Sequence, residues 1–443
     1  MSPGQPSWYR RRPYLHFDLP LSPEDADKYV RDAQRVGSHS FYPLLTYDLA
    51  TPRIRKSQPS ATTSFTKAFK HRNIAYPAHK DGYIFSYYKS ILEPIYEKWL
   101  DSNGLSQSVT AFRGTTHENN VSLAKKAFEF IKNNPGCWIV ATDVESFYDT
   151  IKHDELKNTW ASFLGVDRLP EDHFSVLKAV TQYSVVQRYK AYNLFNIPLF
   201  TSSDRRNRPK RLCTPKQFRS KLVSRGLVEA NPGLRKRQGI PQGVSLSPLL
   251  SNMYMASLDL AIYNWVTTLG GAYWRYCDDI LIVVPQGKRP AILRRLDEEL
   301  KLLGLKRSNT KTHKLTSNKL RSNEQLQYLG FIFNGTEVLV RPSSIHRYHR
   351  KLKRAIRAAG HTRDEETIKS GQIAPLRQQA LYNKYSELPV RGAKIKARKL
   401  RQTYSGNFTH YLASSAVVMN SRAIERQRRK ILKKFRTVVR KHK

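Results

Sequence analysis

The sequence predicts an α+β fold, and two observations support this prediction. Two apolar segments rich in strand-forming residues, 272–275 and 280–284, flank the adjacent acids Asp278 and Asp279 and indicate a hairpin that bends at these acids. Elsewhere, strand-like runs alternate with segments whose apolar residues recur every three or four positions, which is the spacing of packed helices. Strands mixed with packed helices are typical of an α+β domain.

The predicted elements follow one another along the chain. Residues 1–70 are rich in Pro, Ser and turn residues and predict an irregular N-terminal extension with one helix near 23–36. An apolar strand over 137–142 ends at Asp143. Three helices follow: one capped by Asp154 and stopped by Gly165, one from Ser247-Pro248 through Ile262, and one from Ile292 to Gly304. A hairpin comes next, with strands 326–333 and 336–340 joined by Asn334-Gly335, which suits a type I′ turn.

Composition indicates a globular protein that binds a polyanion. The 443 residues are 40% hydrophobic, which supports a real core, and this length allows about two to four domains. The formal net charge is +42, from 77 Lys+Arg against 35 Asp+Glu. Few globular proteins carry such self-repulsion without a polyanionic partner. Nucleic acid is the expected partner, and an acidic membrane surface is the weaker alternative because no basic amphipathic helix stands apart from the core pattern.

Neither a membrane span nor a disulfide framework is expected. No apolar run approaches the about 18 residues that a transmembrane helix needs, and the N-terminus lacks the apolar core of a signal peptide. The three cysteines, Cys137, Cys213 and Cys277, are far apart and form no Cys-x-x-Cys pair. We therefore expect free thiols in a reducing cytoplasm and no zinc site.

The positive charge is concentrated at the C-terminal end. Residues 341–443 hold 28 Lys+Arg against 5 Asp+Glu, with apolar residues interleaved as in packed helices. At this charge density, contact with nucleic acid is favoured over a merely solvated helical face. A second basic stretch, residues 205–211, lies in a predicted loop, where either contact with a phosphate backbone or simple solvation fits equally well.

Three carboxylates carry the predicted chemistry. Asp143 closes an apolar strand, and Asp278 and Asp279 lie at the bend of a hairpin, so neighbouring strands would bring all three to one end of a sheet. Clustered carboxylates repel one another, whereas two Mg²⁺ ions need such a set of hard oxygen ligands. This arrangement indicates phosphoryl transfer. Asp149 and Asp154 are close in sequence, but a turn and a helix start explain them.

Five motifs then occur in a characteristic order. They are DVESFYD at 143–149, QGIPQGVSLSPLL at 238–250, Tyr276-Cys277-Asp278-Asp279, Gly304-Leu305 with Lys311-Thr312, and YLGF at 328–331. Upstream, Pro77, Asp81 and residues 91–97 and 111–114 add to the pattern. Over about residues 65–340 the chain resembles the prokaryotic reverse transcriptases, the group that includes group II intron, retron and phage-defence enzymes.

The resemblance implies a right-hand polymerase with an antiparallel palm sheet. Fingers would span 71–135 after the extension at 1–70, and the palm would span 136–340. The palm would include a fingers-side basic insertion near 195–237 and a primer-grip hairpin near 326–340. Residues 341–443 would form a basic helical thumb that holds a template–primer duplex by its backbone, and so by its shape.

The resemblance also implies roles for individual residues. Asp143, Val144, Asp278 and Asp279 would form the metal-binding set for two Mg²⁺ ions, with Mn²⁺ as a possible substitute, and the three acids would be catalytic. Tyr148 would be the sugar gate that excludes a ribose 2′-hydroxyl, although it could also be a simple core residue. The nucleotide site would further include Arg72 with Lys67 or Lys70, Gln242, Gly243 and Lys311, the last of which could instead be a solvated lysine. Tyr328, Leu329 and Gly330 would form the primer grip, and the nucleic-acid contacts would be Arg113, Tyr276, Arg350, Lys351, Lys353 and Arg354.

The implied activity is RNA-directed DNA synthesis, in which dNTPs are added to a primer 3′-hydroxyl. The partners would be an RNA template, the RNA–DNA duplex and dNTPs. No RNase H-like domain, His-Asn-His endonuclease or retron-type Val-Thr-Gly is found in the sequence, so the chain looks most like the defence-associated enzymes, several of which copy a non-coding RNA. Template-independent or protein-primed synthesis, a retron or maturase-type RNA-binding role, and RNA-dependent RNA synthesis are the alternatives.

Overall fold

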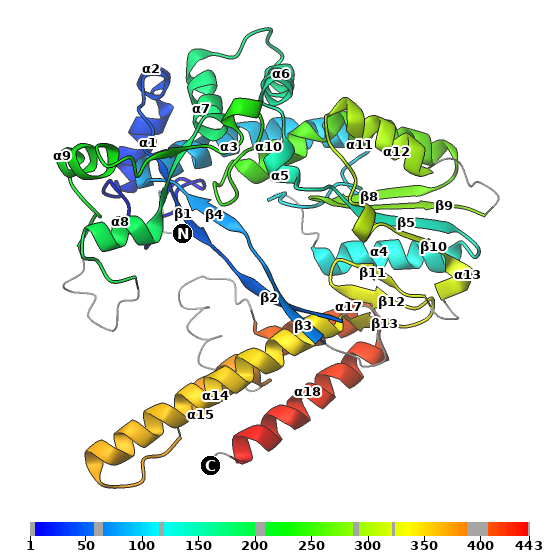
Figure 1. Cartoon of the computed structure of the whole chain (residues 1–443). Coiled ribbons are helices and arrows are strands. Elements are labelled where there is room, and N and C mark those ends of the chain that lie inside the picture. The colour runs from blue at the N-terminus through cyan, green and yellow to red at the C-terminus, as the bar shows by residue number, and fades with distance from the viewer. Residues whose placement is uncertain are drawn as a thin grey trace. The chain divides into compact units, whose positions relative to one another are not determined.

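A computed structural model of the chain describes residues 5–56, 65–114, 119–199, 209–286, 292–320, 324–376, 378–387 and 406–441 (Figure 1). The chain divides into two compact units that alternate along the sequence. Unit 1 comprises Met1–Ser106, Val144–Ala261 and Leu296–Arg307, and unit 2 comprises Gln107–Asp143, Ile262–Arg295 and Ser308–Lys443. Two of the five boundaries between them along the chain lie within helices α11 (Ala256–Thr268) and α12 (Ile292–Leu302).

Unit 1 combines a mixed four-stranded sheet with helices. The strand order is β4-β1-β6-β7, in which β1 pairs antiparallel with β4 and parallel with β6. Helix α3 (His79–Ser102), the longest described helix of this unit, begins where both Asp18 carboxylate oxygens accept hydrogen bonds, at 2.8 Å, from the backbone N–H groups of His79 and Lys80. The elements of unit 1 are α1 (Pro23–Arg31), α2 (Ala33–Gly37), β1 (Leu44–Asp48), β2 (Thr51–Lys56), β3 (Phe65–Lys70), β4 (Asn73–Tyr76), α3 (His79–Ser102), α5 (Phe147–Thr150), α6 (His153–Leu164), α7 (Glu171–Thr181), β6 (Ser184–Gln187), α8 (Arg188–Leu194), α9 (Pro215–Gln217), η1 (Phe218–Val223), β7 (Glu229–Ala230), η2 (Leu234–Lys236) and α10 (Ser247–Tyr254).

Unit 2 contains an antiparallel sheet of order β10-β5-β9-β8, a smaller sheet of order β11-β12-β13, and the C-terminal helices. One continuous hydrophobic core joins helix α4 to both sheets and to the C-terminal helices, and it includes Phe128, Ile139, Leu281, Phe333 and Phe435. The elements are α4 (Asn120–Asn133), β5 (Trp138–Asp143), β8 (Ala272–Tyr276), β9 (Asp279–Val284), η3 (Asn309–Lys311), β10 (His313–Thr316), α13 (Ser317–Leu320), β11 (Leu326–Tyr328), β12 (Phe331–Phe333), β13 (Val338–Val340), α14 (Pro342–Ser370), α15 (Gln378–Tyr385), α17 (Phe408–Val418) and α18 (Arg422–Arg440).

The structure bears out the α+β class and the hairpin of β8 and β9, but several local predictions were wrong. The described part of residues 1–70 is more regular than expected, because it holds two helices and three strands. Asp154 does not cap α6, which begins one residue earlier; Asp154 forms an ion pair with Arg237 at 2.5 Å. Ser247 is the first residue of α10 and not its N-cap.

The predicted hairpin around Asn334-Gly335 is present as β12 and β13, which pair antiparallel, but it is part of a three-stranded sheet with β11. The tight turn lies earlier, at Leu329 and Gly330, which adopt φ angles of 46° and 93°. The connection of β12 to β13 is a longer loop, in which the Asn334 side-chain oxygen accepts hydrogen bonds from the backbone N–H groups of Thr336 at 3.1 Å and Glu337 at 2.7 Å. Asn334 thus uses its side chain to close a loop in place of a left-handed backbone conformation.

Among the described helices, none is long and apolar enough to cross a membrane.

Candidate active site

The backbone pairing of the unit 2 sheet sets two of the predicted catalytic acids directly opposite each other. Asp143, the last residue of β5, is the cross-strand partner of Asp279, the first residue of β9. Directly opposed residues on antiparallel strands project to the same face, and like charges in that position are destabilising. The fold therefore holds two carboxylates together at an electrostatic cost.

The third acid lies in the adjoining turn. Asp278 and Cys277 form the two-residue connection between β8 and β9, and Tyr276 pairs with Asp279 across it. Cys277 has a φ of 60°, in the left-handed region that two-residue hairpins require. The buried side chain of Arg275 donates a hydrogen bond from Nη1 to the carbonyl oxygen of Cys277 at 3.0 Å and so supports the turn that carries Asp278.

The electrostatics of these acids reflect their crowding. Although Asp279 as a whole is exposed, desolvation of its carboxyl, followed by the charges of Asp278 and Asp143, raises its pKa to about 6, whereas Lys311 and Arg341 act in the opposite direction. The Lys311 ammonium forms an ion pair with Oδ2 of Asp143. The other oxygen of Asp143, Oδ1, is buried and has no hydrogen-bond partner among the described residues.

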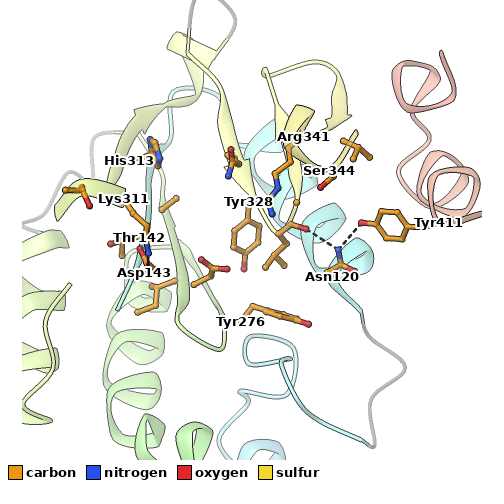
Figure 2. Close-up of a pocket in the computed structure, with 18 of the residues that line it drawn as sticks. Asn120, Thr142, Asp143, Tyr276, Lys311, His313, Tyr328, Arg341, Ser344 and Tyr411 are labelled. Carbon is orange, nitrogen blue, oxygen red and sulfur yellow. Dashed lines mark hydrogen bonds and ion pairs between the residues drawn. The ribbon is translucent and has the colours of Figure 1, made fainter. Parts of the chain in front are cut away.

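Asp143 and Asp279, but not Asp278, line a pocket of about 630 Å³, and all of its lining residues belong to unit 2 (Figure 2). Cations and hydroxyl groups surround the carboxylates, and aromatic residues line another part of the wall. The lining residues include Asn120, Thr142, Asp143, Tyr276, Asp279, Lys311, His313, Tyr328, Leu329, Gly330, Arg341, Ser344, Phe408 and Tyr411. All three residues of the predicted primer grip thus lie in the same pocket as Asp143 and Asp279.

A small hydrogen-bond network fixes the turn between β11 and β12. The side-chain amide of Asn120, the first residue of α4, donates to the carbonyl oxygen of Leu329 at 3.1 Å and to the hydroxyl of Tyr411 on α17 at 3.0 Å (Figure 2). The Tyr328 hydroxyl beside this turn is buried without a hydrogen-bond partner among the described residues. Burial, with smaller contributions from Asp279 and Tyr276, raises the pKa of Tyr328.

The donor set suits divalent cations. Asp143, Asp278 and Asp279 offer carboxylate oxygens, which Mg²⁺ prefers, and the buried, unpaired Oδ1 of Asp143 needs a partner. Over the described ranges, however, no group of three or more His, Cys, Asp or Glu side chains is close enough to hold an ion as it stands. The Lys311 ammonium is the positive charge at Asp143 in this arrangement.

A glycine-rich loop in unit 1 brings together the other predicted nucleotide-site residues. The backbone N–H of Ala75 in β4 donates to the carbonyl oxygen of Gln242 at 2.8 Å. Gly243 has a φ of 118°, and a Cβ added to it would lie 2.4 Å from the carbonyl oxygen of Ala75. Only glycine therefore fits this close approach of loop and strand.

The same loop contacts the segment that carries Tyr148. The backbone N–H of Ile240 donates to the carbonyl oxygen of Tyr148 at 2.9 Å, and the Ser251 hydroxyl lies 3.4 Å from the Tyr148 hydroxyl. Tyr148 is half-buried, and Arg72, just before β4, is exposed. Unit 1 thus places Tyr148, Gln242, Gly243 and the strand after Arg72 around one loop.

Comparison with known protein families gives this geometry a context. Residues 205–333 match the family model described as reverse transcriptase (RNA-dependent DNA polymerase). The chain carries a reverse transcriptase domain. The matched segment contains Gln242, Gly243, Asp278, Asp279 and Lys311, whereas Asp143 and Tyr148 precede it.

Solved structures that are similar to this chain include three telomerases. An apo telomerase from Candida tropicalis truncated from the C-terminal domain has a TM-score of 0.43 and 12% identity over 72% of this chain. A Candida albicans telomerase in complex with a TWJ fragment of telomeric RNA has a TM-score of 0.38 and 14% identity over 72%, and another apo Candida tropicalis telomerase has 0.39 and 15% over 69%. This chain spans 61%, 49% and 51% of those chains, respectively. No curated protein matches it.

The predicted nucleic-acid contacts of the reverse transcriptase domain and its C-terminal helices have varied environments. Arg113 is half-buried and donates from Nη1 to the carbonyl oxygen of Val109 at 2.8 Å. Tyr276 lines the pocket. On α14 the buried residues Tyr348, Leu352 and Ile356 face the core, and the predicted contacts Arg350, Lys351, Lys353 and Arg354 are all exposed.

Some predictions lie outside the described residues, and some pocket residues were not predicted. Residues 205–208 of the second basic stretch, residues 388–405 of the predicted thumb and the side chain of Lys67 are not described. Asn120, Arg341, Phe408 and Tyr411 line the pocket but belong to none of the sequence motifs. Asn120 begins a helix, and Phe408 and Tyr411 lie on another helix, so no local pattern relates them to the distant acids. Arg341 directly follows a predicted strand of the primer-grip hairpin, so its position next to this motif could have indicated its role.

Proposed function

We propose that the chain is a right-hand RNA-directed DNA polymerase that adds dNTPs to a primer 3′-hydroxyl by two-metal phosphoryl transfer. The observation that carries this proposal is the cross-strand pair of Asp143 and Asp279 beside Asp278, in a chain with a reverse transcriptase domain. Fingers at 71–135, palm at 136–340 and a basic thumb at 341–443 remain the proposed domain layout, after an extension at 1–70.

In this proposal the chain's own residues bind, orient and shield the reacting groups. Asp143, Val144, Asp278 and Asp279 would hold Mg²⁺ or Mn²⁺, which when bound would polarise the primer hydroxyl and neutralise the triphosphate. Lys311, whose ammonium lies at Asp143, would meet the departing pyrophosphate as a charge or proton donor. The turn of Tyr328, Leu329 and Gly330 would position the primer end against the carboxylates.

The unit 1 loop would form the nucleotide and template pocket. Gln242 and Gly243 would line it with backbone that approaches closely, and Arg72 would bind the triphosphate. Tyr148 would block a ribose 2′-hydroxyl. We therefore expect Tyr148→Ala to raise the ratio of rNTP to dNTP incorporation about tenfold, because one lost steric contact changes selectivity by about 1–3 kcal/mol. An unchanged ratio in single-nucleotide incorporation assays would assign Tyr148 to the core alone and would reopen RNA-dependent RNA synthesis.

The direct test of the proposed function removes two of the three acids. Asp278→Ala combined with Asp279→Ala should lower dNTP incorporation by at least about a thousandfold, because the carboxylates that bind the metals are lost. RNA binding should remain and thermal stability should not fall, since Asp278 is half-buried in a turn, Asp279 is exposed at a strand end, and the substitutions relieve repulsion between the acids. Retained polymerisation in this variant would refute the proposal.

The proposed biological role is antiviral defence, in which the enzyme copies a dedicated non-coding RNA. Its support is the resemblance of the motifs to defence-associated reverse transcriptases and the net charge of +42, with which we expect the protein to copurify with RNA. Sequencing the copurified nucleic acid would identify template and product together. Synthesis that survives RNase treatment would favour a template-independent enzyme, a covalent protein–DNA bond would favour protein priming, and inactivity on every template would favour a maturase-type RNA-binding role.

A further inference from the structure

Unit 1 contains a strongly basic segment to which the proposed catalytic mechanism assigns no role. Residues 209–237 include nine Lys+Arg and one acid, Glu229. Eight of the nine basic side chains are exposed, and Arg211 is half-buried. The exposed ones are Lys210, Lys216, Arg219, Lys221, Arg225, Arg235, Lys236 and Arg237. We call these eight residues the basic surface of unit 1.

The basic surface is displayed on folded structure and not on a loose tail. Leu212, Cys213 and Leu222 are buried in a hydrophobic cluster with Leu15 and Phe17 of the N-terminal segment. The segment contains α9, which starts with a capping box between Thr214 and Gln217, and the π-helix η1, a rare conformation that often occurs at functional sites. Its charges are therefore held in place before any ligand binds, which lowers the entropic cost of binding.

The segment's other end is anchored by side-chain and backbone bonds. Asn231 donates from its amide to the carbonyl oxygen of Thr181 at 3.0 Å and accepts from the backbone N–H of Gly233 at 2.9 Å. The backbone N–H of Gln238 donates to the carbonyl oxygen of Gly233 at 3.2 Å. Because Gln238 opens the loop that holds Gln242, the basic surface leads within the same unit to the proposed template pocket.

Within the described ranges, an acid neutralises only one of the eight charges of this surface. Arg237 pairs with Asp154, and Glu229 pairs with Lys190 from outside the segment at 3.6 Å. The other seven exposed cations have no carboxylate partner among the residues that the structure describes. Such a concentration of like charge repels itself and is favourable only when a polyanion binds.

We propose that the basic surface of unit 1 binds single-stranded RNA by its phosphates, as a second nucleic-acid contact separate from the helices of unit 2. The inference rests on the proposed function in taking RNA as the template. Guanidinium and ammonium groups are the side chains that bind phosphate. Within residues 209–237, Val223 is the one large apolar side chain that is exposed. The centre of a protein–protein interface needs more apolar residues than this, so a protein partner is disfavoured. Phosphate contacts of this kind are independent of sequence.

The test removes three charges from the surface and compares them with three removed elsewhere in unit 1. The variant is Arg219→Gln with Lys221→Gln and Arg225→Gln in the full chain. The matched control is Lys157→Gln with Arg168→Gln and Lys178→Gln, which are exposed residues of or between α6 and α7. Fluorescence anisotropy with a labelled single-stranded RNA, measured without dNTPs over a range of salt concentrations, gives the affinity and its salt dependence, and thermal denaturation checks the fold.

The expected result is a smaller salt dependence in the first variant only. Each phosphate contact with a single strand contributes about 0.7 to the slope of log affinity against log salt concentration, so the slope should fall by about 2 and the control should match the native chain. Equal slopes in all three proteins would overturn the proposal, as would a loss confined to binding of an acidic protein or of anionic vesicles. Because the assay needs no catalysis, polymerisation with unchanged slopes would contradict this surface alone, and RNA binding without dNTP incorporation would contradict the proposed function alone.

Discussion

The carboxylate pocket of unit 2 and the glycine loop of unit 1 fix their functional residues by different means. In the pocket, the β5–β9 ladder forces Asp143 and Asp279 together against their mutual repulsion, and Lys311 and Arg341 offset part of the charge. In the loop, neutral backbone groups make the contacts, and Gly243 is constrained by space. The pocket is thus sensitive to charge and pH, whereas the loop is sensitive to the addition of a single carbon atom.

The largest effect that separates the two regions is expected at Gly243. Gly243→Ala would place a Cβ 2.4 Å from the carbonyl oxygen of Ala75, so the loop or β4 must move. Because a displacement of about 1 Å in a reactant site can cost about 100-fold, we expect kcat/KM for dNTPs to fall by about that factor. Steady-state kinetics on a defined template–primer would measure it.

The matched control for this prediction is Gly165→Ala. Gly165 also has a positive φ, 67°, but a Cβ there would meet nothing within 4 Å. It should cost about 1 kcal/mol of stability from backbone strain alone and leave kcat/KM unchanged. If both substitutions had the same small kinetic effect, the close approach of loop and strand would have no catalytic importance.

An intermediate effect is expected where the pocket is held by neutral hydrogen bonds. Asn120→Asp removes both donors of the network to Leu329 and Tyr411, but an acid is favourable in the first turn of α4. We expect about a tenfold weaker functional binding of the primer, seen as a higher KM for template–primer, because hydrogen bonds of this kind contribute about 1 kcal/mol each.

Tyr411→Phe sharpens this prediction, because it removes only the hydroxyl that accepts from Asn120. In a double-mutant cycle with Asn120→Ala, the two changes should be coupled by about 1 kcal/mol. Fully additive effects on KM would show that α17 and the turn at Leu329 act independently.

The smallest effect is the pH dependence of stability that Asp279 of the pocket contributes. The pKa of Asp279 is raised from 3.8 to about 6 in the folded chain, so the native state binds its proton more tightly than the unfolded state does. The stability that Asp279 contributes should therefore fall as pH rises from about 4 to about 6 and then level off. Asp279→Asn should remove this fall and stabilise the chain at pH 7 by about 1 kcal/mol, a value reduced for the residue's solvent exposure.

Denaturant unfolding in the absence of divalent cations would measure this difference. The substitution also removes a catalytic acid, so higher stability should accompany lost polymerisation. Parallel pH profiles for the native chain and the variant would show that the crowding of the three acids carries no energetic cost.

Local sequence patterns predicted the parts of the molecule whose signals are local. An apolar run ending in an acid defines β5 and Asp143, and two β-rich segments around Asp278 define the β8–β9 hairpin. The sequence did not predict which residue caps a helix or closes a turn, because alternatives of similar energy lie one or two positions apart. Asp154 paired with Arg237 and left α6 uncapped, and Leu329 accepted a left-handed conformation that Asn334 was expected to adopt.

The pocket's far wall could not be predicted for a different reason. Asn120 meets Leu329 and Tyr411 across 209 and 291 positions of the chain. No periodicity or turn preference links such distant residues, and their contact arises only when the core that joins α4, the two sheets and α17 is formed. The resemblance to reverse transcriptases supplied roles for the motif residues, but it is silent on this connection.

The cross-strand alignment of Asp143 with Asp279 also limits how this enzyme can change. Side chains alternate between the two faces of a strand, so inserting or deleting one residue within β5 or β9 would turn an acid to the opposite face. Insertions or deletions of a single residue in these two strands should therefore not be tolerated, either in evolution or in protein engineering. New properties would have to arise by substitution, or by insertions in the connecting segments, where the ladder sets no phase.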